Sequence, residues 1–91
     1  ARAALDRAVA LYEDLRATNR LAPTMEADFA EVLGHLGDYH QRTANPKGAC
    51  AAFDRAARLL HAAQARAPLT AFRKQMLEFN QQELEKCRIG G

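Results

Sequence analysis

Three histidines are the side chains in this chain that most invite a metal or proton-transfer role. His35 and His40 are five residues apart, so on a helix they would point to different faces, and His61 lies far along the chain. The HExxH motif and the Cys/His clusters that hold zinc are missing from the sequence. We therefore expect no metal site and no cofactor, and we interpret His40 as a packing residue.

Cys50 and Cys87 are the two cysteines of the chain, and they do not form a CxxC pair. A domain of this size that depends on disulfides normally carries more cysteines. We expect two free thiols in a reducing compartment, which favours a cytoplasmic location. The alternative is a single bridge between the third and fourth predicted helices.

Nucleophilic catalysis finds little support in the sequence. Glu31 and His35 are four residues apart and could pair on a helix surface, but no nucleophile accompanies them. A glycine-rich phosphate loop, a GxSxG motif and a Cys/His nucleophile pair are also missing. We expect no enzymatic activity and assign no catalytic residue.

Composition narrows the class of protein further. The 91 residues are 48% hydrophobic but only 7% aromatic, and alanine dominates, which suits closely packed helices better than a sheet. The 13 basic and 11 acidic residues are interspersed, so no patch for nucleic acid is evident. Since no apolar run approaches the roughly 20 residues that cross a bilayer, we expect neither nucleic-acid nor membrane partners.

The most informative stretch is residues 33–60, which predicts two amphipathic helices joined at residues 44–46. Asn45 is a favourable N-cap, and Pro46 falls at the first helical position, where its missing N–H costs nothing. Small and bulky residues recur at the intervals that let two antiparallel helices pack closely. These residues are Leu33, Leu36, Gly37, His40, Ala49, Phe53 and Ala56.

This spacing resembles the tetratricopeptide repeat (TPR), whose signature has a large residue, Leu-Gly and an aromatic in the first helix and an Ala-x3-Phe pair in the second. Leu33 stands where the family has tryptophan, and His40 stands at the aromatic position. His61 replaces the proline that normally closes the second helix, and Pro68 comes seven residues later, as in extended variants of the repeat. The resemblance implies an all-α fold of antiparallel helical hairpins, stacked as a right-handed α-solenoid.

The chain also resembles itself. Residues 1–12 align with residues 49–60 at seven of twelve positions, which is typical of a repeat array. Pro23 with Thr24 as N-cap and Pro68 with Thr70 as N-cap mark the remaining boundaries. We predict about four helices in a single domain of residues 1–91, a fragment of a longer array. Their expected ranges are 1–19, 25–43, 46–66 and 71–88.

The family resemblance also implies a function, because the first helix of each TPR lines a concave groove that holds a peptide. It places the following groove residues towards a ligand: Glu31, Gly34, Asp38, Gln41 and Arg42. Residues 21–45 carry four acidic residues and one basic residue, so the ligand would be a basic or polar peptide. The competing interpretation is that these residues form a solvent-exposed helix face that binds no ligand. Our first hypothesis is a protein–protein interaction module or scaffold.

The last predicted helix supports a second hypothesis. Phe72, Met76 and Phe79 form one apolar stripe on it, beside a second stripe, which is wide for a helix with one neighbour. These residues would form an interface for a homodimer, or for docking on another part of the same protein. A plain four-helix bundle is the alternative fold, and it predicts that the fourth helix packs against the first.

Overall fold

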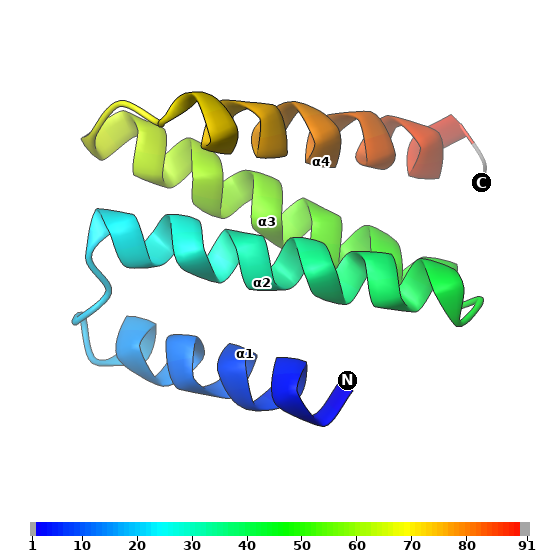
Figure 1. The fold of residues 1–91 in the computed structure, drawn as a ribbon, viewed down its shortest axis with the longest axis horizontal. Helices are drawn as coiled ribbons and strands as arrows, with labels where there is room; N and C mark the ends of the chain where they lie inside the picture. The colour runs from blue at the N-terminus through cyan, green and yellow to red at the C-terminus, as the bar shows by residue number, and fades with distance from the viewer. Residues whose placement is uncertain (1, 90–91) are drawn as a thin grey trace.

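The computed structural model describes residues 2–89, and every regular element in that part of the chain is an α-helix. The elements are α1 (Arg2–Ala17), α2 (Pro23–Arg42), α3 (Pro46–Arg66) and α4 (Ala71–Ile89). Successive helices are antiparallel, so α2 and α4 run in the same direction (Figure 1). The prediction of an all-α chain with four helices is confirmed, although the expected helix start at residue 1 lies outside the described residues.

The turn between α2 and α3 is closed by one short motif. The Asn45 N–H donates to the His40 carbonyl oxygen at 2.8 Å, with Ala44 in the left-handed region at φ 56°. The Asn45 side chain then caps α3, since its Oδ1 accepts from the Gly48 N–H at 3.1 Å. The predicted Asn45 cap is therefore confirmed, and it holds α2 and α3 as a tight hairpin.

The start of α2 differs from the prediction. Its N-cap is Ala22, which makes no side-chain bond, so Thr24 as N-cap was wrong. Pro23 already stands in the first turn, because its fixed φ is helical and its missing N–H leaves one fewer donor to satisfy. The Thr70 cap of α4 is confirmed, since its Oγ1 accepts from the Arg73 N–H at 3.2 Å.

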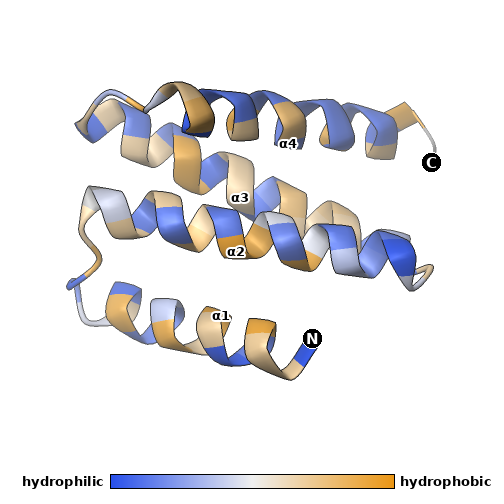
Figure 2. Ribbon diagram, in the orientation of Figure 1, coloured by the Kyte–Doolittle hydropathy of each residue, from blue (hydrophilic) through white to orange (hydrophobic). Residues whose placement is uncertain are grey.

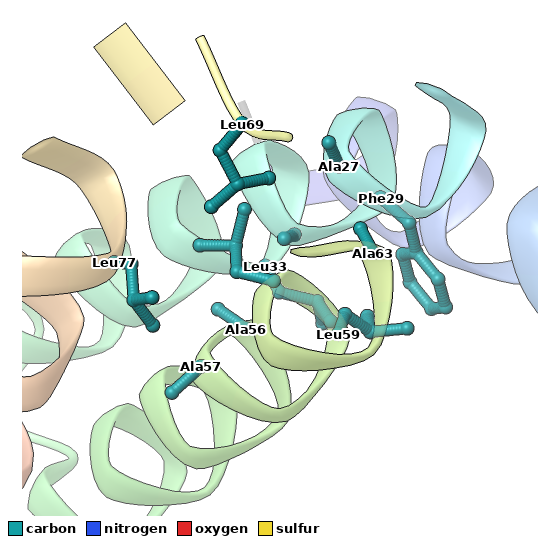
Figure 3. Close-up of a cluster of buried hydrophobic side chains, with 11 residues drawn as sticks. Ala27, Phe29, Leu33, Ala56, Ala57, Leu59, Ala63, Leu69 and Leu77 are labelled. Atoms are coloured by element: carbon teal, nitrogen blue, oxygen red, sulfur yellow. The ribbon is translucent and has the colours of Figure 1, made fainter. Parts of the chain in front are cut away.

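The hydrophobic core lies mainly between α2 and α3. Phe29 and Leu33 of α2 lie with Leu59 of α3 in one almost completely buried cluster (Figure 3). Five alanines occupy other core positions and allow the helix axes to approach closely. The core residues are Ala27, Phe29, Ala30, Leu33, Ala56, Ala57, Leu59, Leu60, Ala63, Leu69 and Leu77.

Helix α1 is held from one side only, and none of its residues is buried. Tyr12 stacks on Phe29 of α2 with ring centroids 5.3 Å apart. Arg55 of α3 contacts both α1 and α2. Its guanidinium lies 2.7 Å from the Glu13 carboxylate of α1 and 5.4 Å from the ring centroid of Phe29 in α2. Aromatic and charged contacts therefore attach α1 to the core.

Helix α4 packs on α3 and also touches α2, but within the described residues it does not meet α1. The helices thus follow one another side by side (Figure 1), and the arrangement differs from a bundle in which the fourth helix closes on the first. Much of α4 is hydrophilic (Figure 2), and its buried residues are Leu77, Asn80 and Glu83.

A disulfide joins Cys50 of α3 to Cys87 of α4, with their Cα atoms 6.1 Å apart, so the prediction of free thiols was wrong and the alternative bridge is confirmed. Pro68 and Leu69 lie in the turn between α3 and α4. Cys50 precedes Pro68 by 18 residues and Cys87 follows Leu69 by 18 residues, so the antiparallel packing of α3 and α4 brings the two cysteines together. Disulfides persist mainly in oxidising compartments, so the two cysteines do not favour a cytoplasmic location.

Candidate functional site

A groove of about 380 Å³ lies between α2 and α4, and we call it the α2–α4 groove. Four of its residues come from α2 and five from α4. It is lined by Glu31, Gly34, His35, Asp38, Phe72, Gln75, Met76, Phe79 and Asn80. The two parallel helices each contribute one wall, and the two walls differ in chemistry.

The α4 wall is apolar and largely open to solvent. Phe72 is 61% exposed and Phe79 is 47% exposed, while Met76 between them is half-buried. Phe79 is held in place by an edge-to-face contact with the buried ring of Phe53, at a centroid distance of 5.8 Å. Exposed aromatic side chains that the fold holds in position lose little conformational entropy when a partner covers them.

The α2 wall is acidic. Glu31, Gly34, His35 and Asp38 follow the spacing of one helical face, so all four line the same groove, Gly34 through its backbone. Asp38 pairs with Arg42 at 2.5 Å, and both side chains are substantially exposed. Glu31 makes no ion pair within residues 2–89. Within residues 2–89, the Glu31 carboxylate is therefore unpaired. The Asp38 carboxylate is paired only with the exposed Arg42, an interaction that solvent weakens.

Polar contacts tie α2 to α4 at both ends of the groove. Arg73 Nη2 of α4 donates to Asp28 Oδ1 of α2 at 2.5 Å, and Gln41 Nε2 of α2 donates to Glu83 Oε1 of α4 at 2.6 Å. At 1.5 Å per helical residue, these contacts are about 15–20 Å apart along the helices. They fix the width and the length of the groove.

Asn80 forms part of the groove floor and is only 2% exposed. Its Nδ2 donates to the Met76 carbonyl oxygen at 2.9 Å, whereas its Oδ1 has no hydrogen-bond partner in the described part of the chain. Gly34 faces this oxygen across the groove floor, since a Cβ built on Gly34 would lie 3.7 Å from it. The floor therefore carries an unpartnered hydrogen-bond acceptor, which is uncommon in a buried position.

Glu83 is the one group of the site whose pKa departs clearly from its ordinary value. The hydrogen bond from Lys86, at 2.9 Å, and the one from Gln41 lower the pKa of Glu83 below 4.5, and burial offsets part of this effect. Both hydrogen bonds stabilise the carboxylate form. The contact that ties α4 to α2 at this end is therefore stronger when Glu83 is ionised.

The structure divides the predicted groove residues. Glu31, Gly34 and Asp38 line the α2–α4 groove, whereas Gln41 lies beyond its end with Glu83, and Arg42 pairs with Asp38 outside the lining. The predicted interface residues Phe72, Met76 and Phe79 form the opposite wall of this same groove. Two residue sets that the sequence assigned to different functions therefore meet at one place.

Sequence reasoning missed three lining residues, which are His35, Gln75 and Asn80. Gln75 lies three residues after Phe72 and Asn80 lies four residues after Met76, so helical spacing alone could have placed them on the same face as the apolar stripe. The predicted repeat-signature residues lie instead in and around the α2–α3 contact, all buried except the half-buried Leu36: Leu33, Leu36, Gly37, His40, Ala49, Phe53 and Ala56.

A second hollow, of about 600 Å³, lies beside the disulfide. Exposed Lys47 and Lys86 and the hydrogen-bonded Gln41 form much of its rim. It has no exposed aromatic side chain among its lining residues. Because its lining includes no aromatic side chain, we regard the α2–α4 groove as the better candidate site.

Two further features were sought in residues 2–89, a cluster of metal-ligand side chains and a membrane-spanning helix. These residues contain no group of three or more side chains that could hold a metal ion. None of their helices is long and apolar enough to cross a membrane.

Comparisons with protein-family models, with curated proteins and with solved structures find no match to the chain.

Proposed function

We propose that this chain is a protein–protein interaction module that binds a segment of another protein in the α2–α4 groove. The observation that carries the proposal is the position of Phe72 and Phe79, two exposed aromatic side chains that face an acidic helix across the groove. Exposed aromatic residues beside polar groups are typical of the centres of binding sites. The groove offers a partner both an apolar contact and polar groups that orient it.

The order of helix contacts supports a TPR-like arrangement. In that arrangement each helix packs on its sequence neighbours, and the first helices of successive repeats also touch. Here α2 contacts α1, α3 and α4, and α4 contacts α3 and α2. If α1 and α3 are second helices, then α2 and α4 are first helices, and the α2–α4 groove lies on the face that the family uses for ligands.

A selection from a displayed peptide library against the 91-residue chain tests this proposal. Phe72→Ser removes one aromatic side chain of the groove, and its 61% exposure predicts that the fold is kept. Leu11→Ser is the matched control, because Leu11 on α1 is 60% exposed and lies outside the groove. We expect selected peptides to bind the Leu11→Ser chain normally and the Phe72→Ser chain at least about tenfold more weakly.

Equal binding to the two variants would rule out the groove as the site. Circular dichroism of both variants provides the control for folding. A selection that yields no peptide sensitive to Phe72→Ser would also count against the proposed function.

A further inference from the structure

The charge of the α2–α4 groove indicates which ligands it favours. Its charged lining residues are Glu31 and Asp38, and no lysine or arginine lines it in the described chain. Within residues 2–89, the one cation paired with these carboxylates is the exposed guanidinium of Arg42, which a ligand can displace at small cost. The groove is therefore complementary to a positively charged side chain.

The unpartnered Oδ1 of Asn80 points to the same ligand chemistry. It is a buried acceptor at the groove floor, and leaving a buried acceptor unpaired is unfavourable. Glu31 lies one helical turn from Gly34, which faces Asn80. Because this oxygen is almost inaccessible to solvent, an ammonium or guanidinium group in this part of the groove would bind the Glu31 carboxylate and interact with the amide oxygen only through space.

The walls of the groove also restrict the backbone of the ligand. Both walls are helices whose main-chain groups bond within the helix, so an extended segment finds no strand edge with which to pair. A helical segment satisfies its own main chain and presents side chains only. Between the polar contacts at its two ends the groove is about 15–20 Å long, which corresponds to about three helical turns.

We infer that the partner segment is a short amphipathic helix with one bulky apolar side chain, which contacts Phe72, Met76 and Phe79, and an adjacent lysine or arginine, which binds at Glu31. This inference rests on the proposed function, because it names the class of ligand that the same groove takes. The apolar side chain supplies contact area, and the cation fixes the orientation of the helix.

The test uses three synthetic helical peptides of about 14 residues. They share one leucine and phenylalanine stripe and carry lysine, glutamine or glutamate at the flanking positions. Fluorescence anisotropy measures their binding to the 91-residue chain at about 50 mM and about 500 mM salt. We expect the lysine peptide to bind about tenfold tighter than the glutamine peptide at low salt, and the glutamate peptide to bind most weakly.

Two variants with the same change of net charge locate the effect. Glu31→Gln should reduce the preference for the lysine peptide about fivefold. Asp14→Asn, on the exposed surface of α1 and outside the groove, should leave that preference unchanged. High salt should reduce the preference in the wild-type chain as well.

The outcomes separate this inference from the proposed function. Equal affinity for the three peptides, combined with loss of binding in Phe72→Ser, would overturn the cation preference and leave the groove as the binding site. Equal effects of Glu31→Gln and Asp14→Asn would show general charge attraction and would likewise overturn it. Failure of all three peptides to bind would overturn the inferred ligand class, and the library selection would then decide the proposed function independently.

Discussion

Gly34 and Gly37 both lie inside α2, where each costs up to about 1 kcal/mol relative to alanine. The fold explains only one of them. A Cβ on Gly37 would lie 2.7 Å from the ring of Phe53, which is completely buried and has no room to move. A Cβ on Gly34 would make an ordinary contact with Asn80 and would add a methyl group to the groove floor.

Alanine at these two positions should therefore have opposite effects on stability. We expect Gly34→Ala to raise the free energy of unfolding by about 0.5–1 kcal/mol. Gly37→Ala should lower it by about 1–3 kcal/mol, because the methyl group overpacks the core against Phe53. Urea unfolding monitored by circular dichroism measures both changes.

Gly34→Ala also tests the groove without damaging the fold. The added methyl group should weaken a selected groove peptide although the protein becomes more stable. Destabilisation by Gly34→Ala would contradict the open groove floor described here.

Glu83 makes the stability of the chain dependent on pH. Its pKa is lowered in the folded state, first by Lys86 and then by Gln41, so ionised Glu83 stabilises the fold at pH values above its unfolded pKa. That contribution is lost as the pH falls below about 4.5 and through the lower folded-state pKa. We expect Glu83→Gln to lower the free energy of unfolding by about 1 kcal/mol at neutral pH and by progressively less in acid.

Urea unfolding at a series of pH values from neutral to acidic checks this prediction. Glu85→Gln is the control, because Glu85 is exposed and lies 3.7 Å from Arg88 on the surface of α4. A Glu83→Gln effect that stays constant across the series would contradict the role of the ionised carboxylate.

Among the elements, α4 is attached to α2 by two polar contacts and to α3 by packing and a disulfide. Leu77 belongs to the common core, and the disulfide Cys50–Cys87 fixes the C-terminal end of the helix to the first turns of α3. Since α4 supplies the apolar wall of the groove, these attachments also keep the groove in shape.

Reduction of the disulfide should destabilise the chain by about 3–4 kcal/mol, because the bridge closes a long loop in the unfolded state. Unfolding in urea with and without dithiothreitol measures the change. A Cys50→Ser, Cys87→Ser double variant should show the reduced stability from the start and no response to dithiothreitol. Equal stability of the oxidised and reduced wild-type chain would show that packing alone holds α4.

At the scale of the whole molecule, the exposed apolar surface is dispersed over three helices. The large exposed hydrophobic residues of the described chain are Leu11, Met25, Phe72, Phe79 and Ile89. A stable dimer normally buries about 800 Å² on each partner. Two aromatic side chains in one groove supply only part of such an area.

We therefore expect the 91-residue chain to be monomeric. Light scattering over a range of protein concentrations should give the mass of one chain throughout. A mass of two chains, restored to one by Phe72→Ser, would instead favour the homodimer hypothesis, with the groove covered by the second copy.

The local features of this fold were predictable from the sequence because they depend on neighbouring residues. Apolar spacing identified the four helices, and Asn45 and Thr70 marked helix starts through hydrogen bonds over three residues. Thr24 failed as a cap because Pro23, one residue earlier, already begins the helix. Local chemistry thus determined most boundaries to within about two residues.

The candidate site was decided only by the tertiary structure. The sequence identified Glu31 and Asp38 on one helix and Phe72, Met76 and Phe79 on another, but it assigned them to separate surfaces. The packing of α4 on α3 brings these helices together, joins the two sets in one groove and turns Gln41 towards Glu83. The same packing brings Cys50 to Cys87. Such contacts depend on the relative position of whole helices, which a periodic pattern within each helix does not specify.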